Sequence, residues 1–112
     1  MPRPRKIRSV QGRPISDSFI PNNVPPWGRD ETVLSIEGFE AVRLSDYQGM
    51  DQETSARVMN VSRQTFGRIL AEARAIVADA LVMGKTLRIE GGHYETPPMR
   101  RRRRRRGWGG TQ

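Results

Sequence analysis

The feature that most constrains this chain is a series of helix starts and helix stops between residues 34 and 84. Each start is a side chain whose oxygen can accept a hydrogen bond from the first turn of a helix. The starts are Ser35, Asp51 and Ser62. Each start is followed by a residue that tolerates left-handed backbone angles. The stops are Gly49, Asn60 and Gly84. The series predicts helices at about residues 36–47, 52–59 and 63–83.

Apolar residues support this assignment. Leu34 can pack on Phe39 across the first start, and Val61 can pack on Phe66 across the third, as hydrophobic staples. On a helical wheel the apolar side chains of the third helix fall in one arc of about 140°, which predicts the side that faces the core. This arc holds Thr65, Phe66, Ile69, Leu70, Ala73, Ile76, Val77 and Ala80.

The flanking segments predict little regular structure. Residues 1–31, the N-terminal arm, hold six of the eight prolines, and we expect them to be extended, with one short strand near residues 6–10. Trp27 is expected to anchor this arm to the core. Residues 85–90 alternate in polarity, which predicts a strand with Leu87 and Ile89 on one face and a partner in the arm. Residues 95–112 are of low complexity and are expected to be disordered.

The second and third helices have the layout of a helix-turn-helix at about residues 51–70, in which the small Ala56 lets the helices approach closely. The other side of the third helix has long donors at its edges and small residues along its centre, a shape that can enter the major groove of DNA. This set is Arg63, Gln64, Gly67, Arg68, Ala71 and Arg74. Arg63 and Arg68 can bond guanine and Gln64 can bond adenine. Ser62 and the first N–H groups of the helix can contact a phosphate.

These patterns predict a mainly α fold. We expect a small three-helix, helix-turn-helix domain at residues 32–94, preceded by the extended arm and followed by one short C-terminal strand and a disordered basic tail. The function expected from them is sequence-specific binding of double-stranded DNA by a transcriptional regulator.

The net charge of +8 is concentrated at the two ends of the chain. Residues 1–14 contribute five basic side chains and residues 100–106 are seven arginines, whereas residues 15–99 hold eight basic residues and all twelve acidic ones. Runs of like charge commonly bind polyanions, so we expect phosphate or minor-groove contacts from both ends. The alternative for the arginine run is a solubility tail. The candidate contacts are Arg3, Arg5, Lys6, Arg100, Arg101, Arg102, Arg103, Arg104, Arg105 and Arg106.

Composition disfavours several other classes. With no cysteine and one histidine, His93, we expect no metal site, no cofactor and no enzymatic activity. Four helical glutamates are expected to be solvated: Glu37, Glu40, Glu53 and Glu72. The longest apolar run, residues 76–83, contains Asp79 and is too short for a membrane span. Because the first residues also lack the apolar stretch of a signal peptide, we expect a cytoplasmic, nucleoid-associated protein with no membrane or small-molecule partner.

Several runs of residues resemble one protein family. They are Pro2–Lys6, Val61–Leu70, Ala80–Lys85 and Leu87–Gly92, and the resemblance covers about residues 2–94. In these runs the chain is similar to the bacterial and archaeal family UPF0251 (DUF134). The resemblance implies a DNA-binding protein with a helix-turn-helix like that of sigma-factor region 4. The chain departs from the family pattern at Gly38, where a capping-box glutamate often stands, and at Ile7 and Val10, where cysteines often stand.

Two other functions fit the same residues. In one, the arginine-rich ends bind nucleoid DNA or RNA, and the affinity survives loss of Gln64 and Arg68. In the other, the third helix docks a protein partner, as a sigma-like adaptor, and specific and scrambled DNA are not distinguished. For the DNA-reading function we expect a homodimer, because one recognition helix reads few base pairs. Its contacts are expected from Ile76, Val77, Ala80, Leu81 and the strand Leu87–Ile89.

Overall fold

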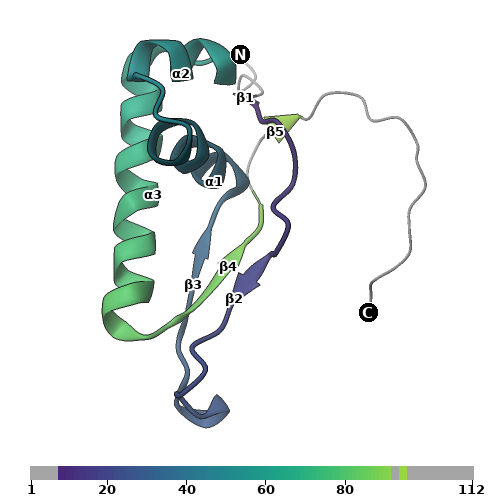
Figure 1. Cartoon of the computed structure of the whole chain (residues 1–112), viewed down its shortest axis with the longest axis vertical. Helices are drawn as coiled ribbons and strands as arrows, with labels where there is room; N and C mark the ends of the chain where they lie inside the picture. Colours follow the sequence, from purple (N-terminus) through teal and green to yellow (C-terminus); the bar gives the residue numbers. More distant parts are fainter. Residues whose placement is uncertain (1–7, 92–93, 96–112) are drawn as a thin grey trace, which may run out of the picture.

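The computed structural model describes residues 8–91 and 94–95. In it the helix α3 runs along one side of a small sheet, and α1 and α2 pack against the N-terminal half of α3 (Figure 1). In chain order the elements are β1 (Arg8–Ser9), β2 (Ser18–Phe19), the 3-10 helix η1 (Pro26–Gly28), β3 (Glu31–Leu34), α1 (Ile36–Val42), the π-helix η2 (Arg43–Tyr47), α2 (Gln52–Met59), α3 (Arg63–Met83), β4 (Thr86–Ile89) and β5 (Tyr94–Glu95).

The predicted helix starts are confirmed by their hydrogen bonds. The side chains of Ser35, Asp51 and Ser62 each accept a hydrogen bond from the backbone N–H three residues later, at 3.0, 2.7 and 3.1 Å. The stops at Asn60 and Gly84 have left-handed backbone angles, with φ of 60° and 64°. The bounds of α2 and α3 agree with the sequence-based prediction, because these local signals determine both ends of each helix.

The first helix differs from its prediction. We expected one α-helix over residues 36–47, but α1 ends at Val42 and continues as the π-helix η2. The Gln48 N–H donates to the Arg43 carbonyl at 2.8 Å, the five-residue spacing of a π turn. A π turn lengthens the hydrogen-bond spacing by only one residue, and the apolar pattern of a five-residue segment is too short to reveal that change.

The absent side chain of Gly38 allows α1 to pack closely on α3. A Cβ atom at this position would lie 3.2 Å from the Ala73 Cβ and 2.8 Å from a terminal methyl of Leu34. The departure from the family pattern at Gly38 therefore permits a close helix contact at the residue whose N–H is capped by Ser35.

The sequence predicts two short strands, near residues 6–10 and at residues 85–90, and both are present as β1 and β4, but the sheet around β4 is larger than predicted. Three strands form a mixed sheet in the order β2-β4-β3, in which β4 is antiparallel to β2 and parallel to β3. The predicted partner in the arm is β2, with Phe19 opposite Leu87. The strand β3 was missed because its four residues end directly at the cap of α1 and are too few to show a clear alternation. A separate parallel pair joins β1 to β5.

Two apolar clusters form the core. The first lies among the helices and consists of Ala41, Leu44, Ala56, Met59, Phe66 and Leu70. The second joins the arm and the sheet to α1 and α3 and consists of Val10, Leu34, Ile36, Ala73 and Ile89. Val10 is 2% exposed, so part of the arm belongs to the core.

Two predictions of burial are wrong. Trp27 is 88% exposed, because it lies in η1, in the loop that extends past the end of α3 (Figure 1). Glu37 and Glu40 are buried rather than solvated. Arg8 reaches Glu37 from β1 at 2.7 Å, and Arg43 pairs with Glu40, so the two buried carboxylates each have a cationic partner. No helix within the described residues is long and apolar enough to cross a membrane.

Candidate nucleic-acid interface

The two sides of α3 are divided as the helical wheel predicts. Phe66, Leu70, Ala73 and Ala80 are buried, and the other members of the predicted core arc are half-buried. The opposite side, here called the outer face of α3, is exposed except at Gly67, which is half-buried. The outer face consists of Arg63, Gln64, Gly67, Arg68, Ala71 and Arg74. Ser62, at its start, is also exposed, and its hydroxyl donates to the Thr65 hydroxyl at 3.0 Å.

Positive charge without a carboxylate partner gathers on this face. Of the ten arginines and lysines between residues 8 and 91, six lie within 4 Å of a carboxylate. Arg63 and Arg68 are two of the other four, which also include Arg13 and Arg29. The first two turns of α3 therefore present two exposed guanidinium groups that form no ion pair within 4 Å with a described carboxylate.

Arg74 differs from the other arginines of the outer face. Its Nη2 lies 2.7 Å from Oδ1 of Asp46 and its Nε lies 3.2 Å from Oδ2, which makes a two-point ion pair between α3 and η2. The hydrogen bond from Arg74 lowers the pKa of Asp46 below its ordinary value. The sequence did not reveal this pair, because the residues are 28 positions apart and the π turn presents Asp46 to α3.

Gln52 is a residue of this surface that the sequence did not indicate. It is the first residue of α2, and its side-chain oxygen lies 3.4 Å from the point where a Cβ atom of Gly67 would stand. A side chain of α2 therefore reaches the central glycine of the outer face. No spacing in the sequence signals this contact, since it depends on the crossing of two helices.

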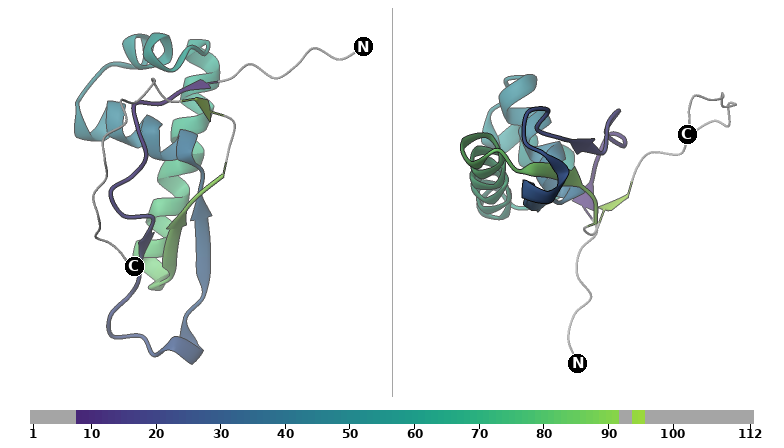
Figure 2. Two further views of the ribbon diagram at one scale, coloured as in Figure 1. Left: turned by 90° about the vertical axis from the view of Figure 1, so that its right-hand side faces the viewer. Right: turned by 90° about the horizontal axis from the view of Figure 1, so that it is seen from below.

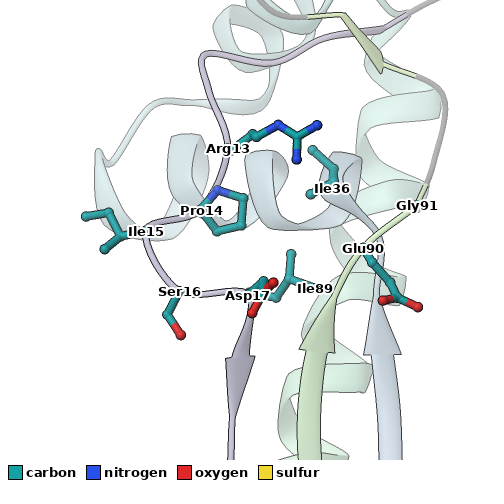
Figure 3. Close-up of a pocket in the computed structure, with 9 residues that line it drawn as sticks. All are labelled: Arg13, Pro14, Ile15, Ser16, Asp17, Ile36, Ile89, Glu90 and Gly91. Atoms are coloured by element: carbon teal, nitrogen blue, oxygen red, sulfur yellow. The ribbon is translucent and has the colours of Figure 1, made fainter. Parts of the chain in front are cut away.

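A pocket of about 630 Å³ lies elsewhere on the domain (Figure 3). Its walls are residues 13–17 of the arm, Ile36 at the start of α1 and residues 89–91 after β4. The side chain of Arg13 extends across it toward Ile36, and Ile15 points away (Figure 3). No residue of α3 lines this pocket, so it is separate from the outer face. Among the described residues, no three side chains of metal-binding type are grouped together.

The basic residues at the chain ends that are predicted to contact phosphates or the minor groove lie outside the described residues, as does His93. These are Arg3, Arg5, Lys6 and the run Arg100–Arg106. The described chain begins at β1 and ends at β5, and this pair lies on the other side of the domain from α3 (Figure 2).

Most of the residues predicted to contact a second copy of the chain pack inside the domain instead. Ile76 and Val77 pack against the second core cluster and Ala80 is buried. Leu87 and Ile89 belong to the central strand of the sheet, where Leu87 is half-buried and Ile89 is buried. Of the predicted contacts on α3, only Leu81 is exposed, at 79%. The prediction placed these side chains at a dimer interface because the sequence did not reveal that β3 and the arm cover them.

Taken together, these features define a small domain of three helices and a mixed three-stranded sheet, with a polar, positively charged outer face on its longest helix. The chain belongs to the DUF134 family, described as a protein of unknown function, whose model matches residues 1–97.

Several curated relatives carry the family name UPF0251. One from Thermoanaerobacter pseudethanolicus is 51% identical over 94 residues, which are 84% of this chain and 80% of the relative. One from Moorella thermoacetica is 48% identical over 110 residues, covering 96% of this chain and 74% of the relative. One from Chlorobaculum tepidum is 52% identical over 90 residues, covering 80% of this chain and 59% of the relative. No solved structure matches the chain significantly.

Proposed function

We propose that this protein is a sequence-specific DNA-binding protein, a transcriptional regulator that reads the major groove with the outer face of α3. The observation that carries the proposal is the pair Arg63 and Arg68, exposed and without a described carboxylate partner, on either side of Gly67. Side chains of this length around a small residue suit a helix that approaches base edges closely. In this proposal α2, the turn at Asn60 and α3 act as a helix-turn-helix.

Each polar group of the outer face has a role in this proposal. Arg63 and Arg68 each donate two hydrogen bonds to a guanine, and Gln64 pairs with an adenine through its amide. Ser62 and the free N–H groups of the first turn contact a phosphate, because the N-terminus of a helix is positive. The Ser62 hydroxyl then donates its proton to the phosphate instead of to the Thr65 hydroxyl. These are binding roles, and we propose neither a catalytic activity nor a cofactor.

Replacing Asp46 by asparagine is expected to strengthen DNA binding. The change removes a negative charge beside the outer face and releases Arg74 to contact a phosphate. One added phosphate contact steepens the dependence of log affinity on log salt concentration by up to about 0.9. Titration of one duplex at several salt concentrations measures this slope. Asp79→Asn, which breaks the 2.7 Å pair with Lys85, is the matched control and should leave the slope unchanged. An unchanged slope in Asp46→Asn would mean that Arg74 makes no phosphate contact.

Selection of bound fragments from a random pool of duplex DNA tests the proposed function. The full chain is immobilised, and bound fragments are amplified and sequenced over several rounds at fixed salt. We expect one consensus that binds at least about a thousandfold more tightly than its scrambled version. Enrichment without any consensus would contradict the proposal and favour binding through the arginine-rich ends. We also propose a homodimer, although of its expected contacts on α3 only Leu81 is exposed. It predicts a palindromic consensus with half-sites about one helical turn apart, and a single asymmetric site would contradict it.

A further inference from the structure

The side chain of Gln52 lies beside the space that Gly67 leaves open. Gln52 is the first residue of α2, which lies at the N-terminal end of α3 (Figure 1). Its Oε1 stands 3.4 Å from the site of a Gly67 Cβ, and apart from the two chain neighbours of Gly67 no other described side chain comes within 4 Å of that site. The hydrogen bonds among the described side chains leave the Gln52 amide unpaired. A half-buried amide is thus held beside the centre of the outer face with its donors unused.

The charges around Gln52 restrict what it can bind. Asp51 and Glu53 stand on either side of it, and both are exposed. Asp51 caps α2, and the hydrogen bond from the Thr54 N–H lowers the pKa of the Asp51 carboxyl, with smaller contributions from the charges of Arg57 and Arg63. Glu53 lies 3.8 Å from Arg57. The neutral amide is therefore the one side chain of these three that can donate a hydrogen bond to an anion at this edge.

We propose that Gln52 is part of the DNA-binding surface and donates a hydrogen bond to a backbone phosphate at the edge of the groove that α3 enters. This inference rests on the proposed function. In helix-turn-helix complexes the helix before the recognition helix crosses the DNA backbone, and an amide has two N–H donors for such a contact. The small Gly67 leaves room for the Gln52 side chain beside it, since the Gln52 Oε1 would lie in ordinary contact, at 3.4 Å, with a Cβ atom at this position.

The test is the pair of variants Gln52→Glu and Gln52→Ala in the full chain, on both the selected and the scrambled duplex. A glutamate at the first helical position interacts favourably with the helix dipole, so the melting temperature should stay the same or rise. Binding should weaken about tenfold or more on both duplexes for Gln52→Glu, and less for Gln52→Ala, because a carboxylate repels the phosphate whereas alanine only loses a bond. In Gln52→Glu the melting temperature stays the same or rises while the DNA affinity falls. This combination separates a DNA contact from a structural role, because a structural role would lower both.

Gln11→Glu is the matched control. Gln11 is exposed in the arm, its Oε1 accepts a hydrogen bond from Arg43, and a glutamate can accept the same bond. If Gln52→Glu binds both duplexes as tightly as Gln11→Glu does, the inference is overturned. A loss confined to the selected duplex would also overturn it, because Gln52 would then read a base. If the unmodified chain binds neither duplex, the proposed function itself fails, and the inference fails with it.

Discussion

Gly67→Glu is expected to abolish binding to the selected DNA site and to leave the domain folded. Apart from its chain neighbours, the only described side-chain atom within 4 Å of the new Cβ is the Gln52 Oε1, 3.4 Å away at the end of a flexible side chain, so the backbone has no need to move. Glutamate also favours the helix by up to about 1 kcal/mol relative to glycine. Its carboxylate would project from the centre of the outer face into a groove lined by phosphates. Fluorescence anisotropy with labelled duplex measures the binding, and thermal unfolding measures the stability.

Ala78→Glu provides the control for added charge on α3. Ala78 is exposed and lies eleven residues beyond Gly67, about 16 Å further along the helix, past the turns proposed to enter the groove. This variant should keep most of the affinity. Equal losses of affinity in Gly67→Glu and Ala78→Glu would show that a negative charge anywhere on α3 is enough to weaken DNA binding. A collapse of the melting temperature in Gly67→Glu would show instead that residue 67 is needed for packing.

Phe66→Ala is expected to destabilise the domain by about 3–5 kcal/mol, the typical cost of removing a buried phenyl group and leaving a cavity. Phe66 has no exposed surface and lies among Leu44, Met59 and Leu70, where η2, α2 and α3 meet. A small domain is stable by roughly 5–15 kcal/mol in total, so this variant should lose a large part of its stability. Urea unfolding followed by circular dichroism measures the change.

Tyr47→Ala is the matched aromatic control, because Tyr47 is 84% exposed. Its free energy of unfolding should change by less than about 0.5 kcal/mol, as is usual for surface sites. If Phe66→Ala shifts the urea midpoint no more than Tyr47→Ala does, the contact of α2 with α3 does not depend on the first core cluster.

The parts of the fold that the sequence predicts are those that depend on neighbouring residues. A cap such as Ser62 and a stop such as Gly84 act within one turn of a helix, so the bounds of α3 could be predicted closely. The buried and exposed sides of α3 follow from its period for the same reason.

The parts that the sequence does not predict depend on residues far apart in the chain. The sheet pairs β4 with strands that precede the helices, and the second core cluster buries Val10 against α3. In the candidate interface, the pairing of Arg74 with Asp46 and the contact of Gln52 with Gly67 arise from the way η2 and α2 cross α3. Each needs the tertiary structure, since no local pattern links the two partners.

The central claim is that the outer face of α3 reads bases, and the affinities of Arg68→Ala and Gln64→Ala test it most directly. Each variant is titrated against the selected duplex and its scrambled version at one salt concentration. We predict a loss of about 1–3 kcal/mol on the selected duplex and little change on the scrambled one, because a base contact discriminates whereas general charge does not. Equal losses on the two duplexes would contradict the claim and show that these side chains contact only the phosphate backbone.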